Sequence, residues 1–203
     1  DIEDLIADET CVIALTNTGY IKRVPTDTYR EQRRGGKGVI GMNTKEEDYV
    51  EHVFSASTHD YLLCFTEEGR MYWLKPYRVP EGSRQARGRS LANVLQMSQE
   101  EKLAAIICVR ELDDDKHNLL MATKNGVVKK TVLSAYKNVR VAGINAIKID
   151  DNDQLIGVVL TNGENDVMLS TKKGKAIRFH EKGARTMGRV SRGVRGIRLA
   201  EDD

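Results

Sequence analysis

The chain has 203 residues, of which 40% are hydrophobic and 31% charged, a balance typical of a folded globular protein rather than a disordered one. Its 32 basic and 30 acidic residues leave a net charge of only +2, which by itself gives no reason to expect a polyanionic partner. No apolar run approaches the ~20 residues that a membrane-spanning helix needs, and the acidic start, Asp1 to Asp4, has no signal-peptide pattern. Because the first residue is not Met, we expect a segment of a longer protein. Because a membrane span and a signal peptide are both missing from this sequence, we expect a cytoplasmic protein that has no membrane partner.

A repeat appears as the chain is followed from its N-terminus. Four segments share an apolar run, a Thr-x-x-Gly loop and a second strand-like run, with loops at 16–19, 66–69, 123–126 and 171–174. A Gly that ends a short loop between two apolar runs predicts a β-hairpin with the Gly in the left-handed region.

A second element follows each hairpin, and it combines small with apolar residues. Its four copies are 38–42, 90–94, 143–147 and 193–197, and we expect each to form a further strand that approaches its neighbour closely. Two apolar runs between the repeats, 103–109 and 155–160, predict buried strands.

Four short strands in about 50 residues match one blade of a propeller. We therefore predict an all-β, propeller-like single domain of four-stranded repeats. Four repeats are visible, and their approximate blades are 1–45, 46–97, 98–149 and 150–203.

The charges follow this repeat. The stretches that run from each Thr-x-x-Gly loop to the end of the second element are 16–45, 66–97, 123–149 and 171–199. They hold 29 of the 32 basic residues but only 6 of the 30 acidic ones. If the repeats are blades around an axis, this sorting predicts a positive band that binds double-stranded DNA through phosphates, without reading bases. The cations predicted to lie on that band are Lys22, Arg23, Arg30, Lys75, Arg78, Arg84, Arg87, Arg89, Lys129, Lys130, Lys137, Arg140, Arg178, Lys182, Arg185, Arg189 and Arg192.

The most distinctive stretch is Gln32-Arg33-Arg34-Gly35-Gly36-Lys37-Gly38. Its glycines let the backbone approach a ligand, and its cations can donate charge-assisted hydrogen bonds to phosphate. The alternative interpretation is a solvated, charged turn. The stretch is not a Walker A loop, because Gly38 stands where that motif needs Ser or Thr.

The sequence gives no sign of a catalytic or metal site, so we expect neither catalysis nor a cofactor in this chain. Cys11, Cys64 and Cys108 lie far apart in apolar runs and predict the buried, reduced thiols of a cytosolic protein. The acidic clusters 113–115 and 150–153 fall between predicted strands and are interpreted as polar turns.

The chain closely resembles the C-terminal domain of the DNA gyrase A subunit in the run Gly19-Tyr20-Ile21-Lys22-Arg23 and in the heptapeptide 32–38. The heptapeptide matches the signature box of that domain, and the repeats extend the resemblance over the whole chain. The resemblance implies a β-pinwheel, usually of six blades, that wraps DNA chirally so that gyrase can introduce negative supercoils. It also implies that Gln32 to Gly38 complete the wrap, with Arg33, Arg34 and Lys37 on phosphates and the glycines shaping the loop.

The same resemblance implies partners beyond DNA. These are the rest of the gyrase A subunit, together with the gyrase B subunit, in an A2B2 holoenzyme of the bacterial cytoplasm, associated with the nucleoid. That holoenzyme is an ATP-dependent type II topoisomerase, an isomerase, whose nucleophilic tyrosine, ATP and Mg²⁺ sites lie in other parts.

Two alternatives remain open. A propeller-type protein-interaction module would expose an apolar or aromatic patch and bind in a salt-tolerant way. A topoisomerase IV-like domain would bend DNA without wrapping it fully. The count of four repeats instead of six implies either a truncated domain or a shortened one.

Overall fold

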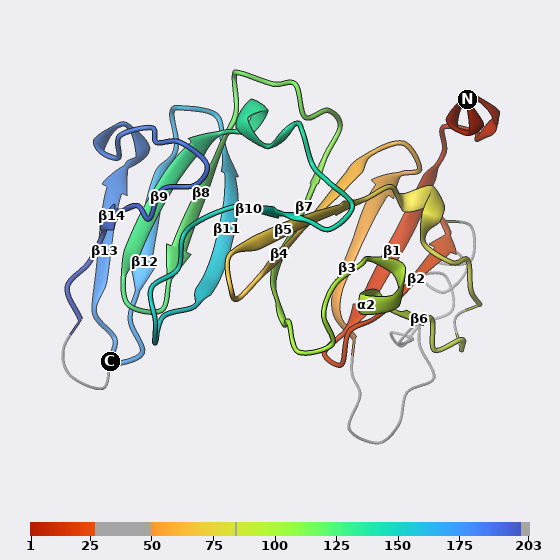
Figure 1. Cartoon of the computed structure of the whole chain (residues 1–203), viewed down its shortest axis with the longest axis horizontal. Helices are drawn as coiled ribbons and strands as arrows, with labels where there is room; N and C mark the ends of the chain where they lie inside the picture. Colours follow the sequence, from red (N-terminus) through yellow and green to blue (C-terminus); the bar gives the residue numbers. More distant parts are fainter. Residues whose placement is uncertain (27–49, 84, 200–203) are drawn as a thin grey trace, which may run out of the picture. The chain divides into compact units, whose positions relative to one another are not determined.

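The computed structural model describes residues 1–26, 50–83 and 85–199, and in these ranges the chain is built from short strands and single turns of helix (Figure 1). It divides into two compact units. The first comprises 1–62, 73–99 and 108–110, and the second comprises 63–72, 100–107 and 111–203. No helix in the described ranges is long and apolar enough to cross a membrane.

All four predicted hairpins are present, and their loops are built alike. The Gly that ends each loop has φ between +86° and +89°. Its amide donates to the Thr carbonyl at 3.0–3.1 Å, and the Thr hydroxyl accepts the next amide at 3.0–3.1 Å. The hairpins are β1–β2 (Thr10–Thr16, Tyr20–Pro25), β4–β5 (Tyr61–Thr66, Arg70–Leu74), β8–β9 (Asn118–Thr123, Val127–Val132) and β12–β13 (Asp166–Ser170, Ala176–His180).

Each of the first three hairpins gains a strand on both edges from the following repeat. β3 (Val50–Ser57) pairs with β1, and β6 (Arg89–Ser90) pairs with β2, which gives the order β3-β1-β2-β6. The same rule produces the sheet β10-β5-β4-β7, which lies mainly in the second unit, and the sheet β11-β8-β9-β14. The strands added there are β7 (Leu103–Val109), β10 (Ile144–Asn145), β11 (Leu155–Thr161) and β14 (Val194–Arg195). The segments 1–45, 46–97, 98–149 and 150–203 are therefore sequence repeats, whereas a sheet combines two successive repeats.

The short added strands correct the predicted alignment of the second element. Ile144 pairs with Met71, and Arg89 pairs with Ile21, so the partner of Gly143 in the second repeat is Gly88 and not Ser90. Both glycines have positive φ, +81° and +87°. A Cβ on Gly88 would lie 2.5 Å from the Ile21 carbonyl oxygen, so only glycine allows this approach.

The segment after Gly88 also differs from the prediction of a strand over 90–94. β6 ends at Ser90, and α2 (Leu91–Val94) is a single helical turn whose Leu91 amide donates to the Gly19 carbonyl at 2.7 Å.

The apolar runs 103–109 and 155–160 do form strands, but they are less buried than predicted. Ile156, Val159 and Leu160 of β11 are 39–53% exposed, while Leu155 and Val158 are buried. In the part of the chain that the structure describes, β11 is an edge strand that pairs with β8 alone, so its outer edge has no neighbouring strand there. Among the described residues, β12–β13 stands as a sheet of two strands.

Each unit has its own core, formed by the inward faces of the hairpins. Ile13, Leu15 and Ile21 are at most 1% exposed in the first unit, and Leu119 and Met121 are fully buried in the second. This burial fixes the hairpins and therefore the turns that follow them.

Candidate nucleic-acid interface

Most of the predicted DNA-contacting cations that the structure describes are accessible. Arg30, the box residues Gln32 to Gly38, and Arg84 lie outside the described residues, so their predicted role stays a prediction. The exposed members are Arg78, Arg89, Lys137, Arg140, Arg178, Lys182, Arg185 and Arg192, and the half-buried members are Arg23, Arg87 and Arg189.

The exposed cations recur at two equivalent places in the repeats. The first is a 3-10 turn directly after the hairpin, where η2 (Pro76–Arg78), η3 (Leu133–Tyr136) and η4 (Glu181–Gly183) carry or precede a cation. The second is the loop that leads into the short added strand, and it contains the exposed Arg140 and Arg192 and the half-buried Arg87. The turns present the charges because buried residues hold them: Pro76, Leu133 and Glu181 are all at the core side.

Several of these cations form ion pairs with the acidic connectors. Arg178 contacts Asp166 at 2.6 Å, and Lys182 contacts Glu164 at 2.8 Å. All four side chains are 44–69% exposed, and such pairs contribute only ~0–1 kcal/mol. A phosphate can therefore replace the carboxylate at low cost.

The half-buried arginines are partly held by their surroundings. The Arg87 guanidinium lies 4.0 Å from the centre of the Tyr20 ring, a cation–π contact. Arg23 Nε donates to the Val79 carbonyl at 3.2 Å.

Four of the predicted contacts are wrong. Lys22, Lys75, Lys129 and Lys130 are buried, with 0–6% exposure, so they cannot lie on a phosphate-binding surface. Sequence reasoning missed this because lysine is rarely buried and its position in a strand does not reveal which carbonyls surround it.

Each of these lysines donates to backbone carbonyls instead. Lys22 Nζ reaches Ser83 O at 2.8 Å and Ala86 O at 3.2 Å, and Lys129 Nζ reaches Ala146 O at 2.7 Å and also Arg189 O and Ser191 O. Burial lowers the pKa of Lys22 to about 8, and burial together with the Arg189 charge lowers the pKa of Lys129 to about 8.

The other two lysines also contact turns, Lys75 the turn between β3 and β4 and Lys130 the turn η4 after the fourth hairpin. Lys75 Nζ donates to the His59 carbonyl at 2.8 Å, pairs with Glu3 at 3.2 Å and lies 3.5 Å from the centre of the Tyr61 ring. Lys130 Nζ donates to the Glu181 carbonyl at 2.8 Å.

Other exposed cations lie in the same stretches but were not singled out from the sequence. The Thr-x-x-Gly loops and the short added strands contribute Lys124, Lys172, Lys173, Lys175, Arg195 and Arg198. These residues are among the 29 basic residues of the four stretches, so the sorting of charge along the chain is the sequence signal for them.

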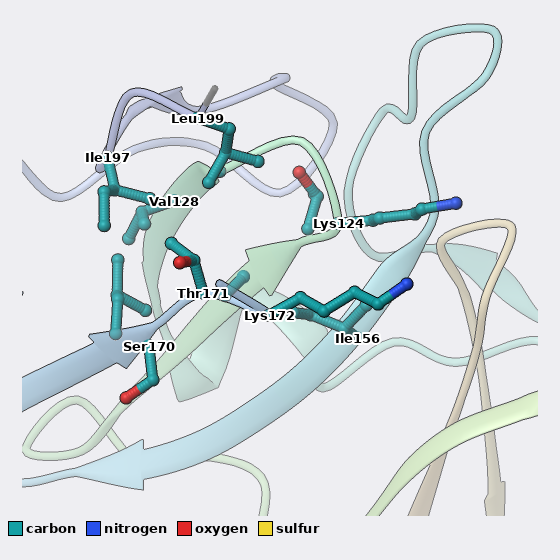
Figure 2. A pocket seen from close by; sticks show the side chains of 12 residues that line it. Lys124, Val128, Ile156, Ser170, Thr171, Lys172, Ile197 and Leu199 are labelled. Carbon is teal, nitrogen blue, oxygen red and sulfur yellow. The ribbon is translucent and has the colours of Figure 1, made fainter. Parts of the chain in front are cut away.

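The second unit also has a pocket of about 220 Å³ with apolar walls (Figure 2). Val128, Ile197 and Leu199 line it, and Lys124 and Lys172 stand at its edge. The exposed side chains of Met168 and Ile177 lie on β12–β13, the sheet that has two strands in the described ranges where the others have four.

The thiols and carboxylates form no further chemical centre in the described ranges. Cys11 and Cys64 are buried as predicted, whereas Cys108 is half-buried and its thiol donates to Asp60 at 3.3 Å. The described residues include no group of His, Cys, Asp and Glu that could hold a metal ion.

The fold and the distribution of cations define the class. This is an all-β repeat domain of the β-pinwheel type, in which successive repeats exchange strands and equivalent turns carry cations. The model of the DNA gyrase C-terminal domain, a β-propeller family, matches residues 12–57, 60–110, 117–162 and 165–203, and the chain belongs to this family.

Curated relatives and solved structures agree with that assignment. The chain is 50% identical to the DNA gyrase A subunit of Clostridium acetobutylicum over 97% of its length, and 48% identical to that of Salmonella typhimurium over 100%. It covers 24% and 23% of those two proteins, so it spans about a quarter of their length.

Two solved structures share the fold. The C-terminal domain of DNA topoisomerase IV has a TM-score of 0.81 at 28% identity, with 97% of this chain and 59% of that chain covered. The DNA gyrase A C-terminal domain has a TM-score of 0.73 at 25% identity, with 96% and 62% covered.

Proposed function

We propose that this chain binds double-stranded DNA through the basic turns and loops of its repeats, without reading the base sequence, and wraps it with a fixed handedness. The observation that carries the proposal is the sorting of charge. The four repeat stretches contain 29 of the 32 basic residues, and in the described ranges their exposed cations recur at equivalent turns.

Repetition matters because each contact is weak. One exposed cation contributes little, but neutralising ~6–10 phosphates releases counterions and makes affinity fall ~10³–10⁵-fold between 50 and 200 mM salt. Cations placed by successive repeats favour a bent duplex, since bending increases the number of phosphates within reach.

The proposed cellular role follows from the family. The chain would serve as a DNA-wrapping part of the A subunit of gyrase, an A2B2 type II topoisomerase that introduces negative supercoils in the bacterial cytoplasm, at the nucleoid. The catalytic tyrosine, ATP and Mg²⁺ would be supplied by other parts of that enzyme. The box Gln32 to Gly38 would complete the wrap, as the family resemblance implies.

The test is topological. The chain is incubated at rising concentration with nicked circular DNA, the nick is ligated, and the shift in linking number is read on a gel. A shift of one sign that is lost in the Arg33→Ala/Arg34→Ala/Lys37→Ala variant supports chiral wrapping through the box. Absence of binding even at low salt refutes the proposal.

The likeness to the topoisomerase IV domain favours one second candidate, in which the chain bends DNA without wrapping it. In that case the same assay gives salt-sensitive binding with no shift in linking number.

A further inference from the structure

Two of the buried lysines occupy the same place in two repeats. Lys22 and Lys129 are the third residues after the Gly of their hairpin loops, in β2 and β9. They are 0% and 1% exposed. In the second repeat this place is taken by Tyr72, whose hydroxyl donates instead to Glu101 at 2.9 Å.

The loops that the two lysines contact are also equivalent. The residue after each lysine forms a parallel bridge to the loop, Arg23 to Glu81 and Lys130 to Thr186. On this register Ala86 corresponds to Ser191, and each lysine donates to that carbonyl, at 3.2 Å and 3.3 Å.

The contacted loops are rich in arginine. The segment 83–90, which ends with β6, contains Arg84, Arg87 and Arg89, and the segment 188–195, which ends with β14, contains Arg189, Arg192 and Arg195. The corresponding segment beside Tyr72, residues 138–145, contains only Arg140.

Burying an ammonium group is costly unless its hydrogen bonds are satisfied, and here two or three carbonyls accept from each one. These carbonyls belong to irregular segments, and three of them accept from a second donor as well: Ser83 O from the Ala86 amide, Ser191 O from the Lys148 amide and Ala146 O from the Tyr136 hydroxyl, each at 3.1 Å. Each ammonium group adds a link between two carbonyls of one loop, Ser83 and Ala86 for Lys22, and Arg189 and Ser191 for Lys129. The lysine therefore fixes the path of the loop from the side opposite to the solvent.

We propose that Lys22 and Lys129 are positioning residues for DNA binding, which hold the arginine-bearing loops of the following repeat in one conformation. The inference rests on the proposed function. A loop that is already ordered loses less conformational entropy when its arginines meet phosphates, so affinity rises without a contact between the lysine and DNA.

The experiment replaces Lys129 in the full chain. Lys129→Met removes the ammonium group, and Lys129→Tyr installs the side chain type that the second repeat already accommodates against Gly143. Lys116→Met is the matched control, because Lys116 is an exposed cation of the same unit that lies outside the basic stretches. Affinity for a linear duplex is measured over a range of salt concentrations.

We expect both Lys129 variants to bind about three- to tenfold more weakly than the wild type, which is the cost of ordering one or two arginine side chains. Lys116→Met should stay within about twofold. Hydrogen exchange without DNA should show faster exchange of the Met187 amide, which donates to Lys130 O at 2.8 Å beside the loop.

A double-mutant cycle separates positioning from the loss of a charge. If Lys129 acts through the loop, the Lys129→Tyr/Arg192→Ala double variant should lose less affinity, relative to the wild type, than the product of the two single losses. Independent, multiplying losses would overturn the inference, and so would Lys129→Tyr binding as well as Lys116→Met. If the wild type does not bind DNA at low salt, the proposed function is refuted. If the wild type binds and the Lys129 variants bind equally well, only the positioning role is refuted.

Discussion

The docking of each repeat on the next can be tested at a single glycine. Gly126 and Gly174 end the same Thr-x-x-Gly loop in the third and fourth repeats, with φ of +87° and +86°. An added Cβ at Gly174 would meet nothing within 4 Å, but at Gly126 it would lie 2.5 Å from the Ile197 carbonyl oxygen and 3.0 Å from Ile197 Cγ2. The two positions therefore share the backbone strain and differ in the segment of the following repeat, residues 196–197, that covers Gly126.

The structure sets the expected magnitudes. Alanine in the left-handed region costs ~1–2 kcal/mol at either position. At Gly126 the substitution also displaces the segment whose Gly196 and Ile197 amides donate to the Gly126 carbonyl, at 2.8 Å and 3.3 Å. Losing two such bonds costs ~1–3 kcal/mol, and partial exposure of Ile197, which is 8% exposed, adds ~1 kcal/mol. We expect Gly126→Ala to lower the free energy of unfolding by ~2–4 kcal/mol more than Gly174→Ala.

Urea unfolding of the two variants and the wild type measures this difference, and hydrogen exchange locates it. The Gly196 and Ile197 amides should exchange faster in Gly126→Ala and at the wild-type rate in Gly174→Ala. Equal losses of stability in the two variants would refute the view that residues 196–197 of the next repeat pack on Gly126.

Three further predictions concern titration and reactivity. The folded-state pKa values of Lys22 and Lys129 are about 8, below the ~10.4 of a free lysine, so between these values the folded state binds fewer protons than the unfolded state. The free energy of unfolding should therefore rise with pH across this window, and it should rise less steeply in the Lys22→Met/Lys129→Met variant. The hydrogen bond to the Ile6 carbonyl and the contact with the Glu3 carboxylate raise the pKa of His59, so the anchoring of the N-terminal segment should be complete below pH ~6.5 and weaken as pH rises through the folded-state pKa. NMR titration measures this pH dependence, and a His59→Gln variant should not show it. Burial raises the pKa of Cys64 and of Cys108 to about 12, and Asp60 contributes to the shift of Cys108. Both thiols should therefore react slowly with a disulfide reagent at pH 8 until urea is added, and fast labelling of native Cys64 would contradict the fold.

Elements that depend on local chemistry can be predicted from the sequence. The Thr-x-x-Gly loops need a residue at positive φ and a hydroxyl that accepts the next amide, and both requirements are visible in four copies. The apolar runs on either side predict strands, the repeat predicts a propeller-like all-β domain, and the resemblance to the gyrase A C-terminal domain implies the β-pinwheel. The sorting of charge along the chain is likewise a property of the sequence.

Tertiary contacts, in turn, determine which strands belong to one sheet and which cations face solvent. Two-residue strands such as β6 and β14 have no periodicity of their own, and their register depends on the close contact of Gly88 with Ile21 and of Gly193 with Val128. A lysine in a strand carries the same charge whether its ammonium group meets water or backbone carbonyls. Lys22 and Lys129 are buried because loops from the next repeat fold over them, and the local sequence carries no trace of this long-range contact.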